Sequence, residues 1–252
     1  MQPNAPLATK LAVITGAAGE IGAAAARLMA MRGARIVAID RPGSNFAPLR
    51  EAIGDDLVTI EADVTDEASV FAYVEQAKSV TGRIDIFFNN AGIGGRFARI
   101  ADYTLDDFRA VMAVNVEGVF LGLKYVLPIM QAQGFGSIIN SSSASGLTGS
   151  PGMWGYNASK HAVVGLTRVA ATEAAPKGVR VNCINPGPIR SQMMGLLDES
   201  LGLEEAKRAR GIPARRYGLA EEVAGLVAFL ASDDATYING AVHAIDGGLT
   251  AI

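Results

Sequence analysis

Cysteine and histidine are nearly missing from this chain of 252 residues, which contains one cysteine and two histidines. Cys183 alone cannot form an internal disulfide or a cysteine cluster for zinc. It lies in VRVNCIN, an apolar run that predicts a buried strand and an unreactive thiol. The histidines, His161 and His243, lack the H-E-x-x-H spacing of a zinc enzyme, so we expect no metal site.

Charge of one sign and long apolar runs are missing as well. The chain has 22 basic and 25 acidic residues and no basic run that would follow a phosphate backbone, so we expect no nucleic-acid partner. No stretch approaches the ~20 uncharged apolar residues of a membrane span, and the N-terminus lacks the regions of a signal peptide. We therefore expect a cytoplasmic protein that does not bind a membrane.

Aromatic residues are few, at 6%, whereas glycine is abundant, with 29 residues. This glycine content exceeds the usual ~7% and predicts many tight turns. The apolar content of 50% and the length suit one large α/β domain, so we expect residues 1–252 to form a single domain.

Short apolar runs alternate along the chain with longer segments of helical character. The runs are LAVIT, RIVAI, LVTIE, IDIFF, SIIN, VRVNCI and AVHAI. They are continuously apolar rather than alternating, which is typical of a parallel sheet covered on both faces. The series predicts a doubly wound, Rossmann-type α/β fold of about seven strands, with a ligand crevice beyond the carboxyl ends of the strands.

One segment interrupts this alternation. Residues 188–218 contain SQMMGLLDESLGLEEAKRA and show no clear strand period. In a compact domain, so long an interruption is usually a functional loop, so we expect a substrate lid there.

The first apolar run leads directly into TGAAGEIG, which contains Gly16, Gly19 and Gly22. Glycines at such a turn let the backbone approach a pyrophosphate, and the N-terminus of the following helix stabilises its charge. Glycine-rich turns without a ligand also occur between a strand and a helix. The residues at the ends of the following strands therefore indicate whether this turn binds a nucleotide.

The second apolar run ends at Asp40, in AIDR. A carboxylate at this position can accept hydrogen bonds from both ribose hydroxyls of an adenosine, and it repels the additional phosphate of NADP. Arg41 favours the opposite choice, because a guanidinium can pair with that phosphate. A phosphate beside Asp40 would face a like charge, so we expect NAD.

Two later strand ends complete the expected nucleotide site. Asp63 and Val64, in ADVTD, can hold an adenine between a polar edge and an apolar side chain. The amides of NNAG can tie neighbouring strands together, while Gly92 leaves room for a cofactor.

The sequence YNASK places Tyr156 and Lys160 four residues apart on a predicted helix, so their side chains share one face. Ser143 follows the preceding strand, and strand ends and helix starts meet at the carboxyl edge of such a sheet. Free tyrosine titrates near ~10, so it becomes a base near neutrality only when a cation stabilises the phenolate. An ammonium ~4 Å away at an effective dielectric of ~20 contributes about 4 kcal/mol, or up to roughly three pKa units. We predict that Tyr156 is the acid or base, that Lys160 lowers its pKa, and that Ser143 donates a hydrogen bond to the substrate.

With these motifs in this order, the chain resembles the short-chain dehydrogenase/reductase family. The resemblance covers TGAAGEIG, NNAG, VMAVNVEG, NSSS, YNASK, NPGPIRS and IDGG. It implies hydride transfer between a nicotinamide and a carbinol or carbonyl carbon without a metal, and it implies a homotetramer. The implied catalytic residues are Asn115, which would hold a water of the proton relay, Ser143, Tyr156 and Lys160. The expected cofactor-binding residues are Gly16, Gly19, Glu20, Ile21, Gly22, Asp40, Arg41, Asp63, Val64, Asn90, Ala91, Gly92, Tyr156, Lys160, Pro186, Gly187, Ile189 and Ser191.

Two positions depart from the family pattern. Glu20 replaces the middle glycine of the turn, and an acidic side chain there would repel a pyrophosphate if it pointed inward, so we expect it to point outward. Ser191 stands where the family more often has threonine, and either hydroxyl can bond the nicotinamide amide.

The substrate pocket is expected to be apolar, because methionine adapts to irregular shapes and tryptophan offers a broad apolar face. The expected substrate-binding residues are Ser143, Ser145, Met153, Trp154, Met193 and Leu197, with Met194 and Leu196 beside them. This set favours a hydrophobic, cyclic secondary alcohol or ketone. Arg96, Arg99 and Arg190 keep open an NADP-dependent 3-oxoacyl carrier-protein reductase, and a dinucleotide-binding sensor without catalysis is a third reading.

Overall fold

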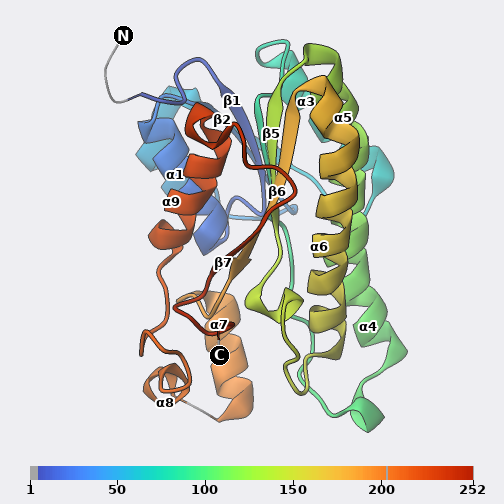
Figure 1. Cartoon of the computed structure of the whole chain (residues 1–252), viewed down its shortest axis with the longest axis vertical. Helices are drawn as coiled ribbons and strands as arrows, with labels where there is room; N and C mark the ends of the chain where they lie inside the picture. Colours follow the sequence, from blue (N-terminus) through green and yellow to red (C-terminus); the bar gives the residue numbers. More distant parts are fainter. Residues whose placement is uncertain (1–4, 203, 252) are drawn as a thin grey trace.

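A parallel seven-stranded sheet forms the centre of the computed structural model, which describes residues 5–202 and 204–251 (Figure 1). The strand order is β3-β2-β1-β4-β5-β6-β7, and every neighbouring pair is parallel. The strands are β1 (Leu11–Thr15), β2 (Arg35–Asp40), β3 (Leu57–Glu61), β4 (Ile86–Asn89), β5 (Gly136–Ser141), β6 (Val179–Pro186) and β7 (Val242–Ile245). This architecture confirms the predicted doubly wound sheet.

Helices cover both faces of the sheet (Figure 1). The helices are α1 (Glu20–Met31), α2 (Ala47–Ile53), α3 (Glu67–Ser79), α4 (Leu105–Met112), α5 (Gly118–Gln133), α6 (Trp154–Ala174), α7 (Gln192–Leu201), α8 (Glu205–Ala209) and α9 (Ala220–Ala231). One core contains Ala12 and Ile14 of β1 together with residues of α1 and α9, and the other contains Leu11 and Val13 together with residues of α3, α5 and α6. Successive residues of a strand therefore enter different cores, which explains why the strands are continuously apolar.

The helical segment Leu105–Gln133 has the length and apolar composition of a membrane span, although 44% of its most apolar window is buried inside the protein. Val119, Val126 and Met130 of this segment pack in the core against the sheet. Core packing therefore accounts for its apolar character. Between α4 and α5 the segment winds as a π-helix over Ala113–Glu117, a feature that the sequence analysis did not predict.

The predicted lid contains α7 and α8 and is closed at its base. A parallel bridge joins Ile189 to Gly218, with the amide of Arg190 donating to the Gly218 carbonyl at 3.0 Å and the amide of Gly218 donating to the Pro188 carbonyl at 2.9 Å. The lid therefore leaves the sheet and returns to it at one point. It also has a small core of its own, formed by Ala209, Ile212, Tyr217, Met194 and Leu249.

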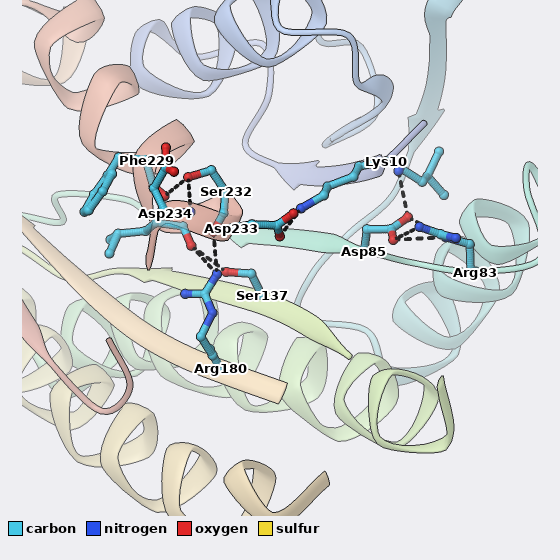
Figure 2. A network of polar contacts seen from close by, with 11 residues as sticks. Lys10, Arg83, Asp85, Ser137, Arg180, Phe229, Ser232, Asp233 and Asp234 are labelled. Carbon is cyan, nitrogen blue, oxygen red and sulfur yellow. Dashed lines mark hydrogen bonds and ion pairs between the residues drawn. The ribbon is translucent and has the colours of Figure 1, made fainter. Parts of the chain in front are cut away.

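Charged side chains organise the opposite edge of the sheet, where the strands begin (Figure 2). Asp85 is buried beside the start of β4, accepts from the amide of Leu11 at 2.8 Å and pairs with Arg83. Arg180 of β6 donates to the carbonyls of Leu230, at 2.8 Å, and of Ser232, at 3.1 Å, and so caps the C-terminal end of α9. These groups surround a depression of about 710 Å³ that lies away from the motifs of the sequence analysis.

We predict that Asp85→Ala lowers the free energy of unfolding by about 2 kcal/mol, because it leaves a buried backbone amide without an acceptor. Urea denaturation measures this change. Asp233→Ala is the matched control, since it removes a carboxylate from an exposed ion pair with Lys10, which contributes little. An equal loss in the two variants would contradict the role given to Asp85.

Candidate active site

The glycine-rich turn after β1 is built for close approach of the backbone. Gly16 has φ +65°, and a Cβ at this position would lie 2.9 Å from the Cα of Ala91. A Cβ on Gly22 would lie 2.2 Å from the Gly16 carbonyl oxygen. No side chain caps the N-terminus of α1, so this end of the helix is open to an anionic group. The turn therefore fits the pyrophosphate of a dinucleotide.

Asp40 lies beside this turn at the end of β2. Its carboxylate accepts from the amide of Ala18 at 2.9 Å, the amide of Arg41 at 2.8 Å and the hydroxyl of Ser44 at 2.8 Å. Three hydrogen bonds fix its orientation next to the glycines, where the ribose of an adenosine would lie. The neighbouring Arg41, which could pair with the additional phosphate of NADP, is exposed to solvent.

The turn is joined to NNAG through Thr15. The Thr15 hydroxyl accepts from the amides of Asn90, at 2.9 Å, and Ala91, at 3.1 Å, and the Asn90 side chain donates to the Thr15 carbonyl at 3.1 Å. The expected tie between neighbouring strands is therefore present at Asn90. Thr15 was not among the predicted site residues, although its position as the last residue of β1 places it in the turn motif.

The third strand end has a simpler arrangement. Asp63 accepts from the amide and the hydroxyl of Thr65, both at 2.8 Å, and so forms a local turn. Val64 packs against α5, because a Cβ on Gly118 would lie 3.0 Å from its Cγ2. Both residues lie on the carboxyl side of the sheet, as an adenine site requires.

Tyr156 and Lys160 share one face of α6, as the sequence predicted. The Lys160 Nζ atom lies 5.5 Å from the centroid of the Tyr156 ring and donates to the carbonyl of Ser141 at 2.9 Å. The lysine is only 4% exposed. This hydrogen bond fixes the ammonium at the carboxyl end of β5, at the edge of the sheet where the site lies.

Burial shifts the pKa values of both Tyr156 and Lys160. Burial raises the pKa of the Tyr156 phenol above its usual value, and a hydrogen bond with Ser143 opposes this shift. Burial also lowers the pKa of Lys160 to about 8. Burial therefore dominates the pKa of the phenol in the chain by itself, and the lowering of this pKa by the Lys160 ammonium stays a prediction.

Asn115 lies in the π-helical segment and is fully buried. Its side-chain oxygen accepts from the amide of Ile93 at 2.8 Å, and its side-chain nitrogen donates to the Ile93 carbonyl at 2.9 Å and to the Ser159 hydroxyl at 3.1 Å. A Cβ on Gly92 would lie 3.1 Å from the Asn115 oxygen and 3.4 Å from Lys160 Nζ. Asn115 therefore anchors the loop after NNAG next to the lysine, and its place in a relay through water stays a prediction.

Asn185 is a site residue that the sequence analysis missed. It is fully buried, and its side-chain nitrogen donates to the Ser143 carbonyl at 2.7 Å and to the Ser142 hydroxyl at 3.2 Å. The Ser142 hydroxyl in turn donates to the Lys160 carbonyl at 2.8 Å. These bonds connect β6, the end of β5 and α6, so they hold the serine and the lysine in register. A polar residue at the end of the apolar run VRVNCIN was the available signal.

The residues expected around a nicotinamide follow β6. Pro186 ends the strand, and the Ser143 hydroxyl lies 3.5 Å from its carbonyl oxygen. A Cβ on Gly187 would lie 2.7 Å from the Cα of Asp246, so the backbone is tightly placed. The Ser191 hydroxyl accepts from the amide of Met194 at 3.2 Å and caps α7. The contact of Ser191 with a nicotinamide amide stays a prediction. So does the contact of the buried Ile189 with the cofactor.

The predicted substrate residues lie around the mouth of this site, with one exception. Met193 of the lid approaches the opposite loop, since a Cβ on Gly94 would lie 3.6 Å from its Cγ. Trp154, at the start of α6, is 45% exposed. Met194, by contrast, packs against the small core of the lid, and its contribution to the pocket wall stays a prediction. Ser145, Met153 and Leu197 are half-buried.

Two of the arginines that favoured an acyl carrier-protein substrate are engaged elsewhere. Arg96 pairs with Asp107 at 3.3 Å, and Arg190 pairs with Glu205 at 2.9 Å. Each guanidinium already has a carboxylate partner.

This fold and site agree with a comparison with known proteins. The family model described as Enoyl-(Acyl carrier protein) reductase matches residues 16–250. The chain therefore belongs to the short-chain dehydrogenase/reductase family of oxidoreductases.

Individual relatives cover almost the whole chain. Levodione reductase of Leifsonia aquatica is 41% identical over 99% of this chain and 97% of its own length, and its crystal structure, covering 97% of this chain and 99% of its own, has a TM-score of 0.94. Cyclohexanol dehydrogenase of Acinetobacter sp. (strain SE19) is 36% identical over 96% of this chain and 95% of its own length. The 3-oxoacyl-[acyl-carrier-protein] reductase of Thermotoga maritima is 40% identical over 95% of this chain and 97% of its own length.

Similar solved structures bind nicotinamide dinucleotides of both kinds. NAD+-bound xylitol dehydrogenase has a TM-score of 0.91 and 34% identity, over 96% of this chain and 99% of that one. ElxO with NADP bound has a TM-score of 0.90 and 30% identity, over 96% of this chain and 99% of that one. The cofactor class of these neighbours is therefore a nicotinamide dinucleotide.

Burial raises the pKa of the Cys183 thiol to about 11, so the thiol is neutral at ordinary pH. We predict that native protein at pH ~8 does not react with Ellman's reagent, because the reactive species is the thiolate. The same protein in urea should release one equivalent of chromophore. Fast reaction of the native protein would contradict this assignment.

Proposed function

We propose that this chain is an NAD(H)-dependent oxidoreductase that interconverts a hydrophobic, cyclic secondary alcohol and the corresponding ketone. The observation that carries the proposal is the placement of Tyr156 and Lys160 on one face of α6, with Ser143 close enough to the phenol to influence its pKa. This group lies on the same sheet edge as the glycine-rich turn, so a bound dinucleotide and a substrate carbon would meet beside it.

Each residue of the group has a distinct task in this proposal. A bound nicotinamide dinucleotide supplies or receives the hydride. Tyr156 gives a proton to the carbonyl oxygen in reduction and takes it back in oxidation. Ser143 donates a hydrogen bond to the same oxygen, and the ammonium of Lys160 provides positive charge near the phenol. The high phenol pKa of the protein chain favours the protonated acid, which suits the direction of ketone reduction.

The apolar character of the mouth supports the substrate class. Six large apolar side chains from three segments are exposed around it: Ile93, Phe97, Leu147, Trp154, Met193 and Leu196. Burying this surface against an apolar substrate would be favourable and would exclude water from hydride transfer. Cyclohexanol dehydrogenase, a relative of this chain, carries the name of a cyclic alcohol.

A 3-oxoacyl carrier-protein reductase is the second candidate, because such an enzyme is 40% identical to this chain. Its substrate carries a phosphopantetheine, which needs free cations near the mouth. Arg96 and Arg190 have carboxylate partners, but these ion pairs are exposed and weak, so the ketone panel below decides between the two candidates.

Apolar residues on α5 and α6 support a proposal that the protein is a homotetramer. Phe120 and Val169 are more than half exposed on these helices. Ala158 and Gly165 of α6 are exposed as well, and small residues allow close approach of a helix from another copy. Sedimentation equilibrium tests the proposed assembly.

We predict that NADH oxidation accompanies the reduction of cyclic or aryl ketones in a panel that also contains a 3-oxoacyl thioester. Cyclic ketones should give the highest kcat/KM. Preferred turnover of the thioester would favour the second candidate. No turnover of any compound would favour a sensor that binds the dinucleotide without catalysis.

The control for this panel is Tyr156→Phe, which removes the acidic hydroxyl and keeps the ring. Loss of general acid catalysis should lower kcat by at least about 10²-fold, with NADH binding nearly unchanged in a fluorescence titration. Full activity of Tyr156→Phe would refute the assigned acid.

For the cofactor, we predict that the protein prefers NAD over NADP. Asp40→Ala should lower the ratio of kcat/KM with NAD to kcat/KM with NADP by about tenfold or more, because the variant lacks the negative charge that repels the 2′-phosphate of NADP. Ser44→Ala is the matched control, because it removes a hydrogen-bond partner of Asp40 and keeps the charge. A parent protein that prefers NADP would overturn the assignment.

A further inference from the structure

We propose that Glu20 is a positioning residue that holds the substrate lid against the glycine-rich turn. Only the kinetic consequences of this inference rest on the proposed function. The Glu20 carboxylate accepts from the amide of Gln192 at 2.7 Å. The two residues are 172 positions apart in the chain and begin α1 and α7, respectively. The sequence analysis placed Glu20 among the cofactor-binding residues, expected its carboxylate to point away from a pyrophosphate and gave it no partner in the protein.

The position of Glu20 is electrostatically favourable. The carboxylate lies in the first turn of α1 and bonds the first amide of α7, so it interacts with the positive ends of two helix dipoles. The amide of Gln192 is one of the donors at a helix N-terminus that have no partner within the helix. One acceptor therefore satisfies this donor and joins the lid to the dinucleotide turn.

Gln192 occupies the point of the lid that faces both expected ligands. Ser191, just before it, is the residue expected to bond the nicotinamide, and Met193, just after it, approaches Gly94 on the substrate side. Fixing the amide of Gln192 therefore fixes the residues on either side of it.

The other polar side chains of α7 for which the described residues show partners bond within the lid. Asp198 pairs with Arg208 at 2.9 Å and accepts from the Tyr217 hydroxyl at 3.0 Å. Within residues 5–202 and 204–251, the bond from Gln192 to Glu20 is the only hydrogen bond between α7 and a segment outside 188–218. At α7 the lid is therefore joined to the glycine-rich turn by one hydrogen bond, which a substitution can remove. The base of the lid is held by the bridge between Ile189 and Gly218.

The first experiment measures hydrogen exchange of the peptide 190–202 in the protein without cofactor. We expect Glu20→Ala to increase its exchange about three- to tenfold, the range given by loss of one hydrogen bond of ordinary net strength. Glu20→Gln keeps an acceptor oxygen but loses the charge, so its exchange should lie between that of the parent and that of Glu20→Ala. The matched control is Glu221→Ala, which removes an exposed acid from the first turn of α9, outside the lid.

The second variant removes the donor instead of the acceptor. Gln192→Pro deletes the amide hydrogen at the first position of α7, where proline is well tolerated. The preceding Ser191 is extended, with φ −161° and ψ 161°, as a residue before proline prefers. Glu20→Ala and Gln192→Pro should have similar effects on exchange, and the double variant should add little to either one.

The kinetic arm follows NADH dissociation by stopped-flow fluorescence. A loosened lid should raise the dissociation rate constant by about three- to tenfold in Glu20→Ala, by less in Glu20→Gln, and not at all in Glu221→Ala. Unchanged exchange of the lid in Glu20→Ala would overturn the proposal, as would equal effects of Glu20→Ala and Glu20→Gln or additive effects of the two single variants. Because the exchange arm uses protein without cofactor, its result does not depend on whether the proposed reaction is observed.

Discussion

The common direction of the seven strands is the constraint on which the site depends. Parallel strands end at one edge of the sheet, so motifs far apart in the chain meet there without any further requirement. The turn after β1, Asp40 after β2, Asn90 after β4 and Ser143 after β5 all use this edge. Charged pairs such as Asp85 with Arg83 serve the other edge, where no motif of the reaction lies.

Competition between burial and charge shapes the reacting group. Lys160 is enclosed, so its ammonium is disfavoured, yet its pKa of about 8 leaves most of it charged at neutral pH. The Ser141 carbonyl compensates part of the lost hydration through a hydrogen bond. Tyr156 is disfavoured as a phenolate for the same reason. The chain by itself therefore holds a protonated phenol and a nearby cation in a buried place.

The fold and most of the site could be predicted because both depend on local patterns. The continuous apolar runs follow from packing on two faces, as Leu11 and Ala12 show by entering different cores. The shared face of Tyr156 and Lys160 follows from helical spacing. What could not be predicted depends on contacts between distant segments: the pKa of Tyr156, set by burial, and the engagement of Glu20 with Gln192. The π-helical turn that carries Asn115 has no comparable sequence pattern.

The bridge between Ile189 and Gly218 closes the base of the lid, and a few further contacts, such as the amide of Ala214 donating to the Gly247 carbonyl at 3.0 Å, join it to the framework. Its small core around Tyr217 packs mainly within itself, so residues of the lid can change with little effect on the two main cores. The proposed substrate lid can therefore change in sequence while the parallel sheet and its two main cores are retained. The same separation offers a natural boundary for transplanting lids between related enzymes.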